Sequence, residues 1–459
     1  MLRVRRFPLS LSRFDRLVWA TMVGLLLLAG FMALRGDRVG ARVVDVFPVD
    51  GSRAVSTRAG LRVTFAQEME AADVSVTVVP DVEAAVSWDG RALLVQPTAP
   101  LAPDTTYSVS VPAGLRSQRG QLLLRPLTWE FHTATPRLLY LGWDRSDVSQ
   151  LFLVSPTGGE PEALTRGKEN VVDYALSPDG TTVLYSVAAP GAASSEMWLV
   201  GTDGRGAGRL LRCDDGLCHR PTWSPDGKRL LYERRNIDAT TQQTGPPRLW
   251  WLDVASGQTL PVFSDSQWLG LGATFSADGR WIGYVAPQSQ EVQLYNLDSG
   301  ETRLLPSETG QSPVWNPTTP TLVFTAYATT IEGFSVHLFY ADLSDAAPVD
   351  LSGAAAVEDD GPVWSPDGAW IAFGRQQAGT TMGKQLWVMR ADGREARALT
   401  VDPAAYYVLP AWSPDGRALA FQRYALAEAN ARPEIWVVDV AGGAPRQVVA
   451  AGQQPTWVP

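Results

Sequence analysis

Three histidines and two cysteines are the residues of this 459-residue chain whose chemistry could support catalysis or metal binding. His132, His219 and His337 stand far apart, and no two of them have the spacing of metal ligands. A Gly-rich phosphate loop and the Gly-x-Ser-x-Gly motif of serine hydrolases are also absent from the sequence. The sequence therefore predicts that the protein is not an enzyme and that it holds no metal or cofactor.

The two cysteines, Cys213 and Cys218, are close in sequence and are followed by His219. In a protein outside the cytoplasm, such a pair favours a small disulfide-closed loop. Two free thiols, or a metal site made by the two cysteines and the histidine, are the alternatives. Structural zinc usually needs four ligands, and the sequence offers no second pair.

An uncharged segment at residues 17–34 predicts a transmembrane helix. Eighteen residues at about 1.5 Å each just span a hydrocarbon core about 30 Å thick. Positive charge on the N-terminal side keeps that side in the cytoplasm. We therefore expect a cytoplasmic basic tail at residues 1–16, a single-pass anchor in the cell membrane, and an extracytoplasmic body. A signal peptide cleaved near residues 39–41 is the alternative. The arginines that precede the segment are Arg3, Arg5, Arg6, Arg13 and Arg16.

Charge is unevenly distributed along the chain. The net charge is −9, but residues 1–42 hold eight arginines against Asp15 and Asp37, a balance of +6. The remaining chain therefore carries a charge of −15. A body of that sign repels a phosphate backbone, so nucleic acid is not an expected partner.

Residues 43–135 read as short alternating strands separated by turns, which predicts a beta-sandwich. Four stretches within it resemble the bacterial Ig-like domains of surface proteins. That resemblance implies a spacer or adhesion module. The stretches are Pro48–Gly51, Thr64–Met69, Leu101–Tyr107 and Trp129–Thr133.

From Arg137 to Pro459 the chain repeats a turn motif at intervals of about 40–50 residues, the period of a four-stranded propeller blade. In Ser-Pro-Asp-Gly, proline presets φ, aspartate accepts backbone amide protons and glycine supplies a positive φ. The motif therefore predicts a hairpin turn. It stands at 177–180, 224–227, 365–368 and 413–416, with variants at 276–279 and 316–319.

Two aromatic columns give an independent count of seven blades. One column follows each turn: Tyr140, Tyr185, Tyr232, Tyr284, Phe324, Phe373 and Phe421. The other lies on the next strand: Phe152, Trp198, Trp250, Tyr295, Phe339, Trp387 and Trp436. The last residues, 455–459, match the strand before the turn at 221–225, so we expect them to complete the first blade and close the ring.

These repeats resemble the TolB-type, WD-repeat-like propellers of bacterial envelopes over residues 137–459. The resemblance implies a fold and leaves the function open. The predicted fold class is all-β: a seven-bladed beta-propeller, preceded by an Ig-like beta-sandwich and one N-terminal transmembrane helix.

Strand order gives a propeller two unlike faces, and here the longer loops gather on one of them, the loop face. Binding residues usually lie on such loops, and Tyr, Trp and Arg are favoured in interfaces. The sequence thus predicts an envelope scaffold whose loop face binds a protein or a glycan. The alternative is a propeller lyase or hydrolase acting on an envelope or extracellular polymer, with His219 and His337 near that face. The candidate binding residues are Arg234, Arg235, Trp268, Phe334, Asp359, Asp360, Tyr406 and Tyr407.

Overall fold

A computed structural model describes residues 13–34 and 40–459, except 72, 190, 192–193, 239, 242, 266, 332, 345, 378, 381–382 and 428–430. Helix α1 (Arg13–Leu34) covers the segment for which a transmembrane helix is predicted. Within the described residues, no helix combines the length and the apolar character that crossing a membrane requires. The membrane anchor stays a prediction, and residues 1–12 of the predicted tail lie outside the described residues.

Contacts divide the chain into two compact units. The first holds Met1–Ser52, Gly60–Gln96 and Tyr107–Phe131, and the second holds Arg53–Ala59, Pro97–Thr106 and His132–Pro459.

The N-terminal part forms two four-stranded sheets, as expected for an Ig-like sandwich. One sheet has the order β1-β3-β6-β5 and the other β2-β8-β7-β4. Alternate residues of β3, β7 and β8 are buried, because successive side chains of a strand point to opposite faces. The strands are β1 (Val43–Phe47), β2 (Ser52–Val55), β3 (Leu61–Phe65), β4 (Thr77–Val79), β5 (Ala84–Asp89), β6 (Ala92–Pro97), β7 (Thr106–Val111) and β8 (Leu127–Thr133).

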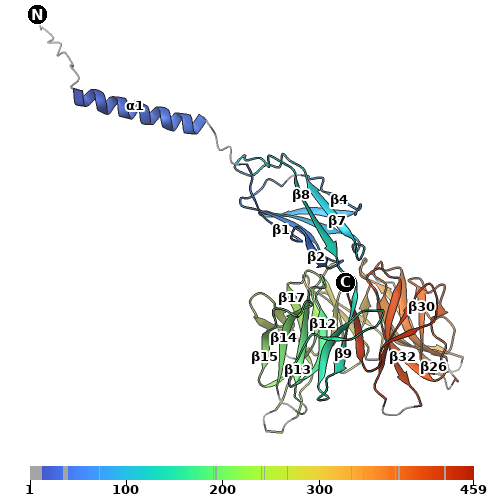
Figure 1. Cartoon of the computed structure of the whole chain (residues 1–459). Helices are drawn as coiled ribbons and strands as arrows, with labels where there is room; N and C mark the ends of the chain where they lie inside the picture. Colours follow the sequence, from blue (N-terminus) through green and yellow to red (C-terminus); the bar gives the residue numbers. More distant parts are fainter. Residues whose placement is uncertain are drawn as a thin grey trace, which may run out of the picture. The chain divides into compact units, whose positions relative to one another are not determined.

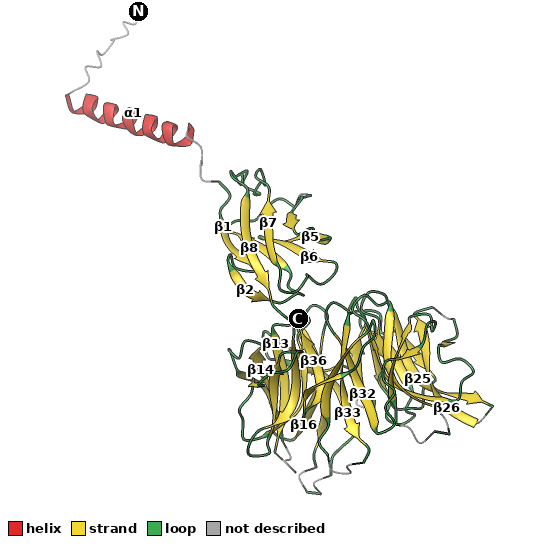
Figure 2. Cartoon of the chain, turned by 45° about the vertical axis from the view of Figure 1, so that its right-hand side comes forward, coloured by secondary structure: helices red, strands yellow, loops and turns green. Residues whose placement is uncertain are grey.

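The described residues from Arg137 onward form seven four-stranded antiparallel sheets, which we number as blades 1 to 7 (Figures 1 and 2). In blades 2 to 7 the four strands follow one another in the sequence. Blade 1 consists of β9 (Arg137–Trp143), β10 (Ser149–Val154) and β11 (Glu162–Ala163), with β36 (Gln453–Val458) added from the end of the chain. From blade 2 to blade 7 the first strands of neighbouring blades contact one another, β36 contacts β32 of blade 7, and β10 of blade 1 contacts β12 of blade 2.

The remaining strands have these bounds. Blade 2 has β12 (Asn170–Leu176), β13 (Thr182–Ala188), β14 (Ser195–Gly201) and β15 (Gly208–Cys213). Blade 3 has β16 (Gly216–Trp223), β17 (Arg229–Asn236), β18 (Arg248–Asp253) and β19 (Thr259–Pro261). Blade 4 has β20 (Leu271–Phe275), β21 (Trp281–Val285), β22 (Val292–Asn296) and β23 (Thr302–Leu305).

Blade 5 has β24 (Val314–Trp315), β25 (Thr321–Thr330), β26 (Gly333–Asp342) and β27 (Val349–Asp350). Blade 6 has β28 (Val357–Trp364), β29 (Trp370–Gln377), β30 (Gln385–Arg390) and β31 (Arg397–Ala398). Blade 7 has β32 (Ala405–Trp412), β33 (Ala418–Ala425), β34 (Glu434–Asp439) and β35 (Arg446–Val449).

The Ser-Pro-Asp-Gly motif forms the turn between the first and second strands of a blade. In blade 2, the Asp179 carboxylate accepts a bond from the Ser177 hydroxyl at 2.6 Å and one from the backbone N–H of Thr181 at 3.1 Å. Gly180 has a φ of +71°, which side chains with a Cβ rarely adopt. The same serine-to-aspartate bond recurs at Ser224, Ser276, Ser365 and Ser413. The motif therefore has the structural role that the sequence predicts.

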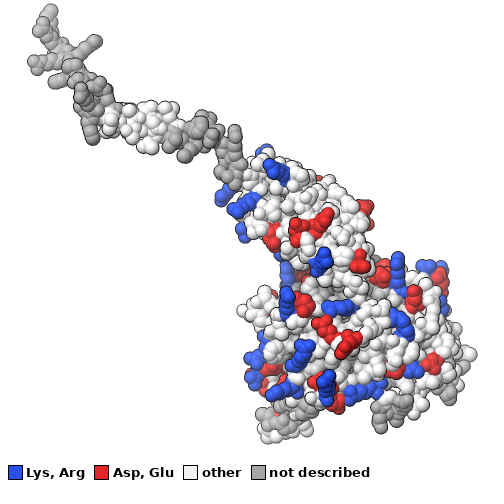
Figure 3. Space-filling view, viewed as in Figure 1, with Lys and Arg blue, Asp and Glu red and all other residues white. Residues whose placement is uncertain are grey.

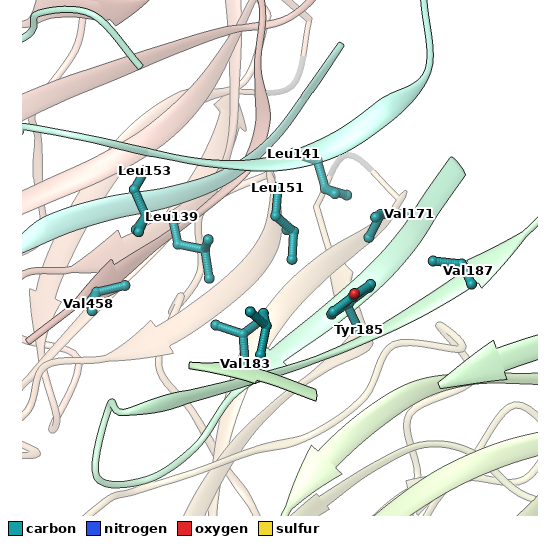
Figure 4. Packing of buried hydrophobic residues seen from close by; sticks show 10 residues of the cluster. Leu139, Leu141, Leu151, Leu153, Val171, Val183, Tyr185, Val187 and Val458 are labelled. Carbon is teal, nitrogen blue, oxygen red and sulfur yellow. The ribbon is translucent and has the colours of Figure 1, made fainter. Parts of the chain in front are cut away.

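Buried apolar side chains fill the spaces between neighbouring blades. Figure 4 shows one such cluster, in which Leu139 and Leu151 of blade 1 pack with Val183 and Tyr185 of blade 2. Val458, from the last strand, belongs to the same cluster. The hydrophobic core of the propeller thus consists of side chains that lie far apart in the sequence.

Candidate functional site

The loop face is defined by strand order. It carries the connections from the second to the third strand of each blade, and from the fourth strand to the first strand of the next blade. The short-turn face carries the Ser-Pro-Asp-Gly turns and the connections from the third to the fourth strand. The two faces therefore differ because antiparallel strands place alternate connections at opposite ends.

The hairpin of β25 and β26 places large apolar side chains in solvent at the loop face. Both strands are ten residues long, and they pair out to Thr330 and Gly333. Ile331 is 99% exposed at the tip and Phe334 is 79% exposed. Tyr327 is also exposed. It lies on the same face of the hairpin as Phe334, because Phe334 is directly opposite Thr329, and Thr329 is two residues after Tyr327 on the same strand. Isolated exposed apolar residues are common, but three on one hairpin make this hairpin a candidate contact surface.

Other exposed apolar side chains occupy loop-face positions of neighbouring blades. Val401 lies in the connection between blades 6 and 7, Tyr424 lies near the end of β33, and Leu426 lies in the connection after β33. Figure 3 shows positive and negative side chains interspersed over the propeller surface in view. In this view, charge of one sign does not dominate the propeller surface, so charge alone does not favour one kind of partner there.

Three predicted residues lie in blade 3 and in the connection from it to blade 4. The Arg234 guanidinium lies 4.9 Å from the centroid of the Trp250 ring and donates to Asp215 at 2.6 Å. Arg235 is half-buried, and its Nε has no hydrogen-bond partner among the described residues. Trp268, in the connection to blade 4, is 40% exposed. Trp268 thus remains available to a partner, whereas Arg234 is held by its neighbours.

The predicted residues of blades 6 and 7 lie deeper than expected for a binding surface. Asp359 is buried, and its two oxygens each accept a bond of 2.6 Å from Arg375. Tyr407 is buried and donates to Asp402 at 3.1 Å. These two residues have internal partners, so they are not available for the surface contact that the sequence predicts.

Asp360 and Tyr406 are partly buried. Asp360 accepts a bond of 2.9 Å from the Lys384 ammonium. Tyr406 is half-buried, with its ring centroid 6.3 Å from that of Tyr424. Of the eight predicted residues, Trp268 and Phe334 therefore present the most accessible side chains.

A second set of polar residues meets between the first strand of blade 2, β12, and the first two strands of blade 3, β16 and β17. His219 is directly opposite Glu233 in the pair β16 and β17. Its Nδ1 lies 4.0 Å from Asp173 Oδ2, and its Nε2 lies 3.9 Å from Glu233 Oε2. Burial lowers the pKa of His219 and raises the pKa of Asp173, so both groups are driven towards their neutral forms.

Comparison between blades shows what is unusual about Glu233. Glu233 and Gln422 both follow the buried aromatic residue of a second strand. Each accepts a hydrogen bond from a bulge residue of the next blade, Gly272 at 2.7 Å and Gln454 at 3.0 Å. A neutral amide is therefore sufficient for this bond. The second carboxylate oxygen of Glu233 is buried, with no hydrogen-bond partner among the described residues.

This cluster was not predicted from the sequence. His219 was considered only with the cysteines and as a loop-face residue, because Asp173 and Glu233 lie 46 residues before and 14 after it. Glu233 is the one carboxylate among the residues that follow the second-strand aromatic residue in the seven blades, a signal that alignment of the repeats could have found. Among the described residues, no group of His, Cys, Asp and Glu side chains could hold a metal ion.

The other predicted chemical residues have structural partners. Cys213 and Cys218 form a disulfide between β15 and β16. His337 is buried, with Nδ1 2.8 Å from Asp350 and Nε2 2.9 Å from the carbonyl oxygen of Ala355. His219 and His337 are therefore not brought together.

Residues 238–459 match the family model described as TolB beta propeller domain, and residues 37–133 match the model described as bacterial Ig-like domain. These two segments are therefore similar to a TolB-type propeller domain and to a bacterial Ig-like domain. Both resemblances that the sequence motifs indicated are confirmed for these residues.

Curated TolB proteins are similar to part of this chain. The Tol-Pal system protein TolB of Anaeromyxobacter dehalogenans is 36% identical over 118 residues, which is 25% of this chain and 25% of that protein. TolB of Anaeromyxobacter sp. strain K gives the same values. The matching segment thus spans a quarter of these relatives.

Solved structures that are similar to this chain include a TolB protein and a lyase. TolB from Acinetobacter baumannii is 13% identical with a TM-score of 0.44, covering 84% of this chain and 83% of that one. Oligogalacturonate lyase from Vibrio parahaemolyticus is 13% identical with a TM-score of 0.49, covering 69% and 87%. We take no functional argument from these two likenesses.

Proposed function

We propose that this TolB-type chain is an extracytoplasmic binding protein of the cell envelope that presents its loop face to a protein partner. The exposed hairpin tip with Tyr327, Ile331 and Phe334 carries the proposal. Water-exposed apolar side chains on a rigid hairpin are typical of surfaces that a partner covers. The similarity to proteins named for the Tol-Pal system supports a place in the envelope.

The proposal includes attachment to the membrane through residues 17–34. This segment is uncharged and follows several arginines, which supports an anchor with a cytoplasmic N-terminus. The test is an alkaline wash of membranes, followed by protease treatment of cells from which the outer layers are removed. We expect the protein to stay with the membrane and its propeller to be digested from outside. Release by the wash would contradict the anchor without affecting the proposed binding.

The binding proposal is tested with a photoreactive amino acid placed at position 334 of the full chain in native membranes. Position 394 is the matched control. Arg394 has an exposed side chain and lies in the turn between β30 and β31, on the short-turn face. We expect one protein to be captured repeatedly from position 334 and not from position 394.

Competition separates specific capture from chance neighbours. An excess of the purified protein should abolish the crosslink, whereas the same excess of an Ile331→Asp, Phe334→Asp double variant should not. Both side chains are exposed, so the double variant should melt like the unchanged protein. Equal capture from the two positions, or equal competition by both proteins, would contradict binding through this hairpin.

The cluster of Asp173, His219 and Glu233 favours a second candidate function, an enzyme acting on an envelope or extracellular polymer. A histidine between two carboxylates can exchange protons with a substrate. The test measures the release of reducing ends or unsaturated products from a panel of envelope and extracellular polysaccharides. Activity lost on His219→Gln would support this function. No product from any polymer would leave the binding function as the better explanation.

A further inference from the structure

Blade 4 departs from the aromatic pairing of the other blades. In those six, the aromatic residue of the second strand lies directly opposite an aromatic residue of the third, as Phe324 lies opposite Phe339. In blade 4, Tyr284 lies opposite Gln293, and Tyr295 lies opposite Ile282. The expected second column is therefore displaced in this blade. The other five pairs are Tyr140 with Phe152, Tyr185 with Trp198, Tyr232 with Trp250, Phe373 with Trp387 and Phe421 with Trp436.

A pocket of about 430 Å³ lies beside Gln293, which stands where the other blades have the aromatic residue of the third strand. Its lining comes from the connection before β20, from β21 and β22, and from β23. The volume is within the range of small-molecule sites. The lining residues that bear on its chemistry are Gln267, Trp268, Tyr284, Gln288, Gln293 and Arg303.

Trp268 supplies an aromatic surface at this pocket. Its ring centroid lies 5.0 Å from that of Phe263, and it meets the Tyr295 ring edge-on at 6.2 Å. The chain approaches closely at Gly270, where a Cβ would lie 2.8 Å from the Tyr284 ring. These contacts hold the connection in place while the indole stays 40% exposed. A fixed, partly exposed indole can stack on a ligand at a small entropic cost.

The polar groups of the pocket are neutral or already paired. The Tyr284 hydroxyl donates to Gln293 Oε1 at 2.7 Å, which leaves the amide nitrogen of Gln293 as a donor. Gln267 and Gln288 are exposed and add two more amides. The Arg303 guanidinium is bound by the Glu301 carboxylate at 2.9 Å and by the backbone carbonyl of Ser344 at 3.1 Å. The pocket therefore has no uncommitted charge among its described lining residues.

We propose that this pocket binds a neutral sugar unit of a glycan. A pyranose ring has one apolar face, which suits the Trp268 indole, and many hydroxyl groups, which suit amides that donate and accept. A charged ligand would meet only the Arg303 guanidinium, which is already paired with Glu301. This site goes beyond the proposed function, since it lies in blade 4 and needs neither the blade 5 hairpin nor a protein partner.

The test is titration calorimetry of the full-length protein with neutral tetrasaccharides of glucose, xylose and N-acetylglucosamine. Tetragalacturonate, which is anionic, serves as the charged comparison. We expect at least one neutral sugar to bind with a dissociation constant of about 1 mM or below. Trp268→Ala should weaken that binding at least tenfold. So should Gln293→Phe, which restores the aromatic residue present at this position in other blades and fills the pocket.

Phe334→Ala is the control, because it changes the same face outside the pocket and should leave sugar affinity unchanged. Thermal melting checks the fold of each variant. If Gln293→Phe does not fold, Trp268→Ala still tests the proposal, because Trp268 is 40% exposed and its removal should leave the fold intact. The proposal fails if no neutral sugar binds, if both pocket variants bind as the unchanged protein does, or if only tetragalacturonate binds. A protein captured through position 334 would stand in each of these cases.

Discussion

The indole N–H of Trp457 donates a 3.0 Å hydrogen bond to the backbone carbonyl of Ala411, so the last strand is bound to blade 7. An equivalent bond from an indole N–H to a backbone carbonyl joins neighbouring first strands elsewhere in the ring. It joins Trp223 to Ala175, Trp364 to Val314 and Trp412 to Val363. β36 also pairs with β9, so it connects both ends of the propeller. The closure therefore has the same inter-blade bond as other junctions.

Deletion of residues 453–459 should destabilise the propeller strongly. The deletion removes the strand pairing with β9 and the buried side chains of Trp457 and Val458. Loss of one large buried aromatic residue alone costs about 3–5 kcal/mol. Urea unfolding of the truncated protein measures the effect, with deletion of Pro459 alone as the control. A truncated protein as stable as the intact one would show that the ring does not depend on this strand.

Glu233→Gln should leave stability unchanged or raise it. Glutamine keeps the acceptor for the Gly272 N–H, as Gln422 does for Gln454, and it replaces the second carboxylate oxygen, which has no hydrogen-bond partner, by an uncharged amide nitrogen, so no charge is buried. Glu233→Ala should cost about 1–3 kcal/mol, because it leaves a buried donor unpaired. Gln422→Ala is the matched control for this loss. If the glutamine variant is as unstable as the alanine variant, the charge of Glu233 is itself required.

The buried pair of Asp359 and Arg375 predicts a strong asymmetry between single and double variants. Asp359→Ala should cost about 3–5 kcal/mol, since it leaves the arginine charge buried without its partner. Replacing the pair by leucine and methionine should recover most of this loss. The exposed pair of Arg390 and Glu395 is the comparison, and Glu395→Ala should cost less than about 1 kcal/mol. Denaturant unfolding at neutral pH measures all four proteins, and equal losses for the two single variants would contradict the expectation.

Tyr140 should make the propeller sensitive to alkaline pH. Burial raises its pKa to about 12, above the model-compound value of 10.0. The raised pKa belongs to the folded state, so the protonated Tyr140 hydroxyl stabilises the fold fully below pH 10. This stabilisation is lost as the pH rises towards 12. The loss is up to about 2–3 kcal/mol. Unfolding at several pH values should show a smaller loss for Tyr140→Phe than for the unchanged protein. Phe152→Leu is the control, and it should lower stability by the same amount at every pH. If Tyr140→Phe shows the same pH dependence as Phe152→Leu and the unchanged protein, this role of Tyr140 is refuted.

Much of the fold follows from local features of the sequence. Ser177, Asp179 and Gly180 form their turn through contacts within a few residues, so the motif alone determines the hairpin. The Ig-like domain and the propeller were predicted in the same way, from strand alternation and repeat spacing. Position in the repeat also assigned Trp268 and Phe334 to the loop face, where their side chains are exposed, although Phe334 lies in β26 and not in a connection.

Register and burial were decided by neighbours distant in sequence. Tyr295 fits the aromatic column by sequence spacing, yet the pairing of β21 and β22 places Gln293 opposite Tyr284 and leaves a pocket there. Asp359 and Tyr407 have the polar character of loop-face residues, yet both are buried, Asp359 against Arg375 of β29 and Tyr407 against Phe421 of β33.

By itself, the sequence determined the turns, the strands and the order of the domains, because a turn or a strand depends on residues next to one another. Only the tertiary structure decided that His219 meets Asp173 and Glu233, and that Trp268 stands beside a pocket without free charge. The physical reason is that a site in a propeller is assembled from several strands, and strand register sets which side chains face one another.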